Sequence, residues 1–105
     1  MTDSTEDDPG LVRLVVRGST LTISGELDAS NSDALSKAIN ELAPGDRTVV
    51  TTSVSFIDCA ALSTLMSAAR ACRTAGSRLV LSRPSWAVER LVELTDATEL
   101  FSIQR

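Results

Sequence analysis

Three side chains in this 105-residue sequence combine a reactive type with a suggestive position: Asp28, Asp58 and Cys59. Each lies where a stretch typical of a strand gives way to a stretch typical of a helix. Carboxylates can serve in acid–base catalysis, and a cysteine at a helix N-terminus can serve as a nucleophile or a redox sensor. The chain contains no histidine, the commonest general base and metal ligand. We therefore expect no catalytic residues, no metal and no cofactor, and predict that the protein is not an enzyme.

The overall charge disfavours nucleic acid as a partner. The chain has 10 basic and 14 acidic residues, a net charge of −4, and its basic residues are scattered. Binding to a phosphate backbone needs clustered Lys and Arg. The first ten residues are acidic and polar, unlike a signal peptide or an anchor, and no apolar run is long enough to span a bilayer. We expect a cytoplasmic protein without membrane contact, with a disordered acidic tail at residues 1–10 and one domain at 11–105.

The apolar pattern predicts strands and helices in alternation. Residues 11–17 and 20–24 read as two strands joined by the turn Gly18-Ser19, an antiparallel hairpin. Residues 47–52 and 78–82 read as further strands, and residues 99–103 as a last short extended segment.

Three helices separate these strands. The first presents one apolar face, with Ser30 or Asn31 as its N-cap, and the second runs from about Cys59 to Ala75, capped by Asp58. Pro84 can occupy the first position of the third. The order ββαβαβα, with a possible final short strand, predicts an α/β fold: a mixed, mostly parallel sheet with an N-terminal β-hairpin and helices packed on it.

In such a sheet, the loops at the carboxyl ends of the parallel strands share one surface. The stretch from Glu26 to Asn31 follows one strand, and the stretch from Ser53 to Leu62 follows the next. We therefore expect Asp28, Asp58 and Cys59 to lie near one another.

Four blocks of sequence resemble the STAS domain of the anti-sigma factor antagonist (anti-anti-sigma factor) family. They are Leu21-Thr-Ile-Ser-Gly-Glu-Leu-Asp28, Val54-Ser-Phe-Ile-Asp58, Ala75-Gly-Ser-Arg-Leu-Val-Leu81 and Pro84-Ser-Trp-Ala-Val-Glu-Arg-Leu-Val-Glu-Leu94. The resemblance implies a bacterial regulator of transcription that binds an anti-sigma factor of serine-kinase fold and so releases a sigma factor. In the family, the kinase phosphorylates a serine at the start of the second helix, within Asp-Ser-small-Gly-Leu, and thereby breaks the complex.

This sequence departs from that motif. Asp58 is kept, but Cys59 stands at the phosphoacceptor position, and Ala60 and Ala61 replace the small residue and the glycine. Val50 stands where the family often has Asp or Asn. Five neighbouring hydroxyls are alternative acceptors, although ordinary surface hydroxyls are the simpler interpretation: Thr52, Ser53, Ser55, Ser63 and Thr64.

Control by oxidation of Cys59 is a second possibility. A helix N-terminus favours a thiolate, whereas the neighbouring Asp58 disfavours it. An internal bridge to Cys72 is excluded, because 13 positions on one helix span ~20 Å and a disulfide needs Cα atoms within about 7 Å. The simpler interpretation is a small residue that resembles unmodified serine in size.

From the resemblance we expect the partner to contact Asp28, Asp58, Cys59, Ala60 and Ser63. The protein should be a monomer or a weak dimer. The alternative function is a STAS scaffold in a signalling assembly, or a subunit of a lipid-related transport system.

Overall fold

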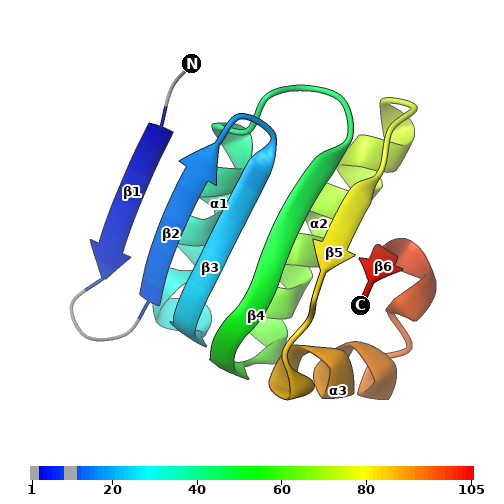
Figure 1. Ribbon diagram of the computed structural model, residues 1–105. Helices are drawn as coiled ribbons and strands as arrows, with labels where there is room; N and C mark the ends of the chain where they lie inside the picture. The colour runs from blue at the N-terminus through cyan, green and yellow to red at the C-terminus, as the bar shows by residue number, and fades with distance from the viewer. Residues whose placement is uncertain (1–2, 9–11) are drawn as a thin grey trace.

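The computed structural model describes residues 3–8 and 12–105, which form one mixed sheet with helices (Figure 1). The strands are β1 (Asp3–Asp8), β2 (Val12–Arg17), β3 (Thr20–Leu27), β4 (Arg47–Ile57), β5 (Leu79–Ser82) and β6 (Ser102–Gln104). The helices are α1 (Ser32–Asn40), α2 (Cys59–Thr74) and α3 (Trp86–Leu94), with short 3₁₀ turns η1 (Ala29–Asn31) and η2 (Thr98–Leu100). The strands lie in chain order from β1 to β6. The predicted α/β fold class, with its leading hairpin and parallel strands, is confirmed.

The hairpin of β2 and β3 is antiparallel, and Gly18 in its turn has φ +60°. A glycine adopts this left-handed conformation without steric cost, so the turn can be tight. From β3 onwards, the pairs β3–β4, β4–β5 and β5–β6 are parallel. The carboxyl ends of β3, β4 and β5 therefore point the same way, to the lower edge of the sheet in Figure 1.

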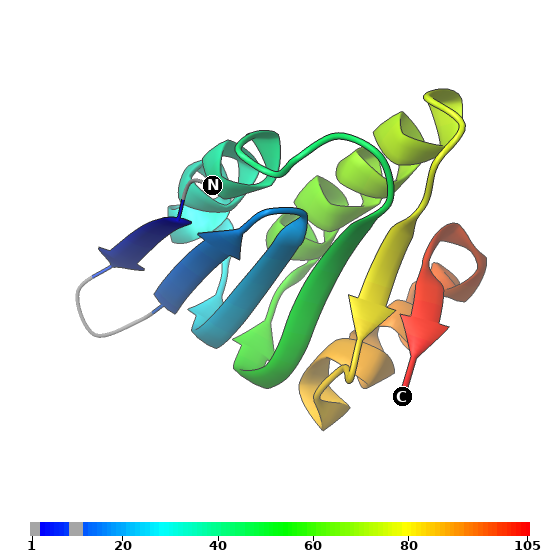
Figure 2. The ribbon, with the colours of Figure 1, turned by 45° about the horizontal axis from the view of Figure 1, so that its top comes forward.

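The helices α1 and α2 lie side by side on one face of the sheet (Figures 1 and 2). The core between them and the strands consists of aliphatic side chains, among them Leu21, Ile23, Leu35, Val49, Leu62, Leu65 and Leu81, each at most 1% exposed. Burial of these side chains is the main favourable contribution to folding. It holds the starts of α1 and α2 at the carboxyl edge of the sheet.

β4 is longer than predicted. The strand was expected to end at Thr52, with a short connection to Asp58, but it continues to Ile57. Its register against β3 shifts twice, and each shift places one extra residue on β4. These bulges put Thr52 next to Ser53, and Ser55 next to Phe56, on exposed positions. Because a bulge interrupts the two-residue alternation of a strand, the pattern from Thr52 onwards resembled a loop.

The N-terminal segment also differs from its prediction. Asp3–Asp8 was expected to belong to a disordered acidic tail, but it forms β1, antiparallel to β2. Without β1, the strand β2 would lie at the edge of the sheet with unpaired backbone N–H and C=O groups, which another segment can satisfy whatever its side chains are. The remainder of that tail prediction, residues 1–2 and 9–10, lies outside the described residues, as does Leu11 of the predicted first strand.

Two helix starts need correction. α3 begins at Trp86, not at Pro84, and Ser85 is its N-cap: its backbone is extended and its hydroxyl accepts the N–H of Val88 at 3.3 Å. At the first helix, Asn31 occupies the N-cap position of α1, one of the two positions expected, but its side chain makes no capping hydrogen bond there; a 3₁₀ turn precedes α1, and Asp28 caps that turn. The last segment, expected to be extended over 99–103, is the turn η2 followed by β6.

Candidate functional site

The starts of η1 and α2 meet at the carboxyl edge of the sheet. Leu27, the last residue of β3, pairs with Ile57, the last residue of β4. The N–H of Asp58 donates to the carbonyl of Leu27 at 3.1 Å, which carries the pairing one residue further. The parallel register thus places Asp28 and Asp58 at neighbouring strand ends, as their spacing predicted.

Asp58 joins the two segments through its carboxylate. Oδ1 accepts the N–H of Ala61 at 2.9 Å, which caps α2 as predicted. Oδ2 accepts the N–H of Ala29 at 3.1 Å, on the segment that follows β3. One half-buried side chain therefore satisfies donors from two elements, and one of these donors, Ala29, lies 29 positions before Asp58 in the chain.

Asp28 forms a capping box with Asn31. Its Oδ1 accepts the N–H of Ser30 at 2.9 Å and also the hydroxyl of Ser30. The side chain of Asn31 completes the capping box, because its Oδ1 accepts the N–H of Asp28 at 2.9 Å. Its amide nitrogen donates to the carbonyl of Glu26 at 2.8 Å. Asn31 is only 2% exposed, and no pattern in the sequence predicted its burial. The carboxylate of Asp28 is thus engaged in local structure, and only part of its hydrogen-bond acceptor capacity remains free.

Cys59 is the first residue of α2 and is exposed, with a free thiol. Ala60 and Ser63 are also exposed, so the beginning of α2 offers a surface of small side chains beside the carboxylate of Asp58. We call the exposed residues Cys59, Ala60 and Ser63, with Asp28 and Asp58, the helix-start surface. The second thiol, Cys72, is buried and free, which agrees with the geometric exclusion of an internal disulfide.

Three of the alternative hydroxyl acceptors are engaged with backbone carbonyls. Thr52 donates to Arg83 at 2.9 Å, Ser55 to Gly25 at 3.3 Å, and Thr64 to Ala60 at 3.3 Å. Ser53 and Ser63 are exposed. Only Ser63 of these two lies on α2, one turn after Cys59.

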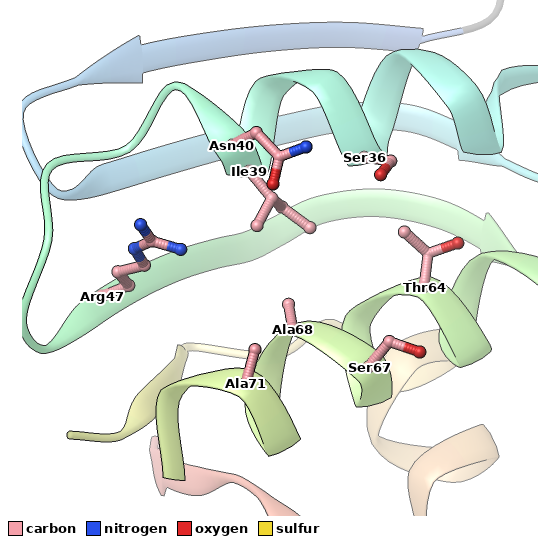
Figure 3. A pocket seen from close by; sticks show the side chains of 8 residues that line it. All are labelled: Ser36, Ile39, Asn40, Arg47, Thr64, Ser67, Ala68 and Ala71. Atoms are coloured by element: carbon pink, nitrogen blue, oxygen red, sulfur yellow. The ribbon is translucent and has the colours of Figure 1, made fainter. Parts of the chain in front are cut away.

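A groove runs between α1 and α2 with a volume of about 300 Å³ (Figure 3). It is lined by Ser36, Ile39, Asn40, Arg47, Thr64, Ser67, Ala68 and Ala71. Arg47 closes one end, where its guanidinium donates to the carbonyls of Leu42 and Ala43, at 3.2 Å each. The remaining side chains are mostly small, so the groove stays open along α2.

Sequence reasoning missed an exposed apolar patch. Within the described residues, Phe56, Trp86 and Leu94 are the large hydrophobic side chains that remain exposed, by 49%, 75% and 69%. All three line the same hollow, between the end of β4 and α3, with a volume of about 190 Å³. The signal was present in the sequence as an apolar residue at each end of α3, but helical periodicity does not show whether such residues face a core or solvent.

Comparison with known proteins assigns the fold to a family. A family model described as "Mlab, STAS domain" matches residues 11–102, so the chain belongs to the STAS domain family. No curated protein sequence matches significantly. Among solved structures, a protein from Thermotoga maritima, assigned as an anti-sigma factor antagonist, is similar at a TM-score of 0.67 and 18% identity. The alignment covers 88% of this chain and 84% of that one, and at this identity it shows a shared fold.

None of the described helices has both the length and the apolar character needed to cross a membrane.

Proposed function

We propose that this protein is an anti-sigma factor antagonist: it binds an anti-sigma factor of serine-kinase fold and so releases a sigma factor, without catalysing a reaction. Membership of the STAS family supports the general role. The observation that carries the proposal is the exposed Cys59 at the first position of α2, beside the capping Asp58. The family resemblance implies that the kinase contacts its antagonist at this position.

The same observation argues for an unusual form of control. A phosphate on the helix-start surface would add about −1.5 to −2 charges beside Asp28 and Asp58, and so repel a partner suited to the unmodified surface. A thiol cannot take part in the serine reaction. The antagonist therefore docks without the phosphorylation that ends the interaction in its relatives.

A titration tests the proposal. The purified protein is added to each kinase-fold anti-sigma factor of the same organism, and the heat of binding is measured by calorimetry. We expect one of these proteins to bind, and its cognate sigma factor to be displaced in a competition experiment. Absence of binding to every such anti-sigma factor would contradict the proposal.

Membership of the STAS family is also compatible with a second candidate, a STAS scaffold in a signalling assembly or a subunit of a lipid-related transport system. Size-exclusion chromatography of the native protein from cells separates the two. Elution in a stable large particle that lacks any anti-sigma factor supports the assembly subunit.

A further inference from the structure

The apolar hollow beside α3 is not used by the site described so far, although it adjoins that site. Phe56 and Ile57 line the hollow, and Asp58 and Cys59 follow them directly in the chain. The other wall is α3, which contributes Trp86, Leu91 and Leu94. In Figure 1, α3 and the beginning of α2 both lie at the lower edge of the sheet. The hollow and the helix-start surface therefore lie at the same edge of the sheet, and Ile57 of the hollow directly precedes Asp58.

The helix-start surface by itself is poor in groups that contribute strongly to affinity. Its exposed residues are small, namely Cys59, Ala60 and Ser63, and Asp58 is occupied by two backbone N–H groups. Stable interfaces depend on a few anchors, most often Trp, Tyr and Arg, which sit in or beside a pocket. The hollow contains Trp86 and Arg90, both of these favoured types.

Arg90 indicates the charge of the partner at this place. Its guanidinium carbon lies 5.3 Å from the centroid of the Trp86 ring, a cation–π distance. No carboxylate within residues 12–105 forms an ion pair with Arg90, and the nearby Glu89 is paired with Arg105 at 2.8 Å. A carboxylate on a partner could therefore pair with Arg90, whose guanidinium lies against the indole of Trp86.

We propose that the anti-sigma factor bound at the helix-start surface also inserts one large apolar side chain into the hollow between Phe56, Trp86 and Leu94, with an acidic residue beside it that pairs with Arg90. This inference rests on the proposed function and specifies the partner's contact chemistry. The contact supplies the affinity that the small residues of the helix-start surface lack, while Cys59 and its neighbours supply the selectivity for an unmodified surface.

The chain provides its own reporter. Trp86 is the single tryptophan of the sequence, so protein grown with 5-fluorotryptophan gives one ¹⁹F resonance that reports on this residue alone. The labelled full chain is titrated with the anti-sigma factor identified by calorimetry. We expect the Trp86 resonance to shift and to saturate at the same stoichiometry as the heat of binding.

Two variants measure the contribution to affinity. Trp86→Ala and Arg90→Ala should each weaken binding by about tenfold or more, as expected for anchor residues. Arg70→Ala is the matched control, because Arg70 is an exposed arginine on α2 that does not line the hollow, and its loss should leave the affinity unchanged. Thermal melting of all three variants should match the parent, since both substituted hollow residues are exposed.

The outcomes separate the two proposals. A complex that forms with wild-type affinity in Trp86→Ala and Arg90→Ala, or that leaves the ¹⁹F resonance unmoved, overturns this inference and leaves the proposed function standing. A resonance that shifts with the concentration of the free protein assigns the hollow to a second copy and also overturns it. If no anti-sigma factor binds the parent protein, both proposals fail together.

Discussion

The carboxylate of Asp58 accepts the backbone N–H of Ala29 at 3.1 Å, across the boundary between two parallel strands. The same carboxylate caps α2 through Ala61. An aspartate is a common N-cap in any helix, but here it also fastens the turn after β3 to the start of the following helix. The relative position of the two halves of the helix-start surface depends on this one side chain.

Asp58→Ala should therefore lower the free energy of unfolding by about 1–2 kcal/mol, the upper part of the range for loss of an N-cap, because two N–H groups lose their acceptor. Urea denaturation followed by circular dichroism measures the change. Amide hydrogen exchange should also accelerate at Ala29, which no helix-cap effect within α2 alone would cause. Glu93→Ala, which removes an exposed carboxylate on α3 that caps no helix, is the control and should change stability by less than about 0.5 kcal/mol. Unchanged exchange at Ala29 would show that the cross-strand contact contributes nothing.

Substitution of Cys59 tests its place in the interface. Cys59→Ser keeps the size and neutrality of the side chain and should bind the anti-sigma factor like the parent. Cys59→Glu places a negative charge beside Asp58, as a phosphate would, and should weaken binding measurably by calorimetry. Equal affinity of the two variants would remove Cys59 from the interface.

Incubation with the kinase-fold partner and ATP tests whether the protein escapes phosphorylation. Intact-mass measurement should show no phosphate on the parent protein, because its exposed acceptor position carries a thiol. The Cys59→Ser variant restores the hydroxyl at the same position and should gain one phosphate under the same conditions. Stoichiometric phosphorylation of the parent would refute the proposal that the protein docks without control by phosphorylation. It would indicate another acceptor hydroxyl, and Ser63 would be the first residue to replace in order to find it.

Thr51 offers a stabilising substitution. It is fully buried on β4, and within the described residues its Oγ1 is the buried side-chain polar atom without a hydrogen-bond partner. Burial of an unsatisfied hydroxyl costs about 1–3 kcal/mol. Thr51→Val keeps the branched shape and should raise the free energy of unfolding by about 1 kcal/mol. A lower midpoint of urea denaturation for this variant would show that the hydroxyl is satisfied in solution.

The ends of α2 and α3 provide a matched pair. Both are followed by a residue with positive φ: Gly76 after α2, with φ +80°, and Asp96 after α3, with φ +59°. This left-handed conformation costs a residue with a Cβ atom about 1 kcal/mol of conformational free energy, whereas it costs glycine almost nothing. Asp96→Gly should therefore raise the thermal midpoint, and Gly76→Ala should lower it. A lower thermal midpoint for Asp96→Gly, or a higher one for Gly76→Ala, would contradict the steric account.

The strand-to-helix order and the cap of α2 were predictable because they depend on local patterns. Alternating or continuous apolar runs specified β2, β3 and β5, and Asp58 before a helical apolar stripe specified its cap, all of which the structure confirms. The proximity of Asp28 and Asp58 followed from a general rule about parallel sheets. The extension of β4 to Ile57 was not predictable, since two bulges shift the alternation and no single residue signals a bulge.

The sequence by itself determined the alternation of strands and helices, the lack of histidine and the thiol at the start of α2, because composition and periodicity are properties of the chain alone. Only the tertiary structure decided that Asp58 also binds Ala29, that Asn31 is buried, and that Phe56, Trp86 and Leu94 line one hollow. Each of these depends on how β3, β4 and α3 lie against one another. That arrangement results from burial of the whole core, a sum over many distant contacts that no short window of sequence contains.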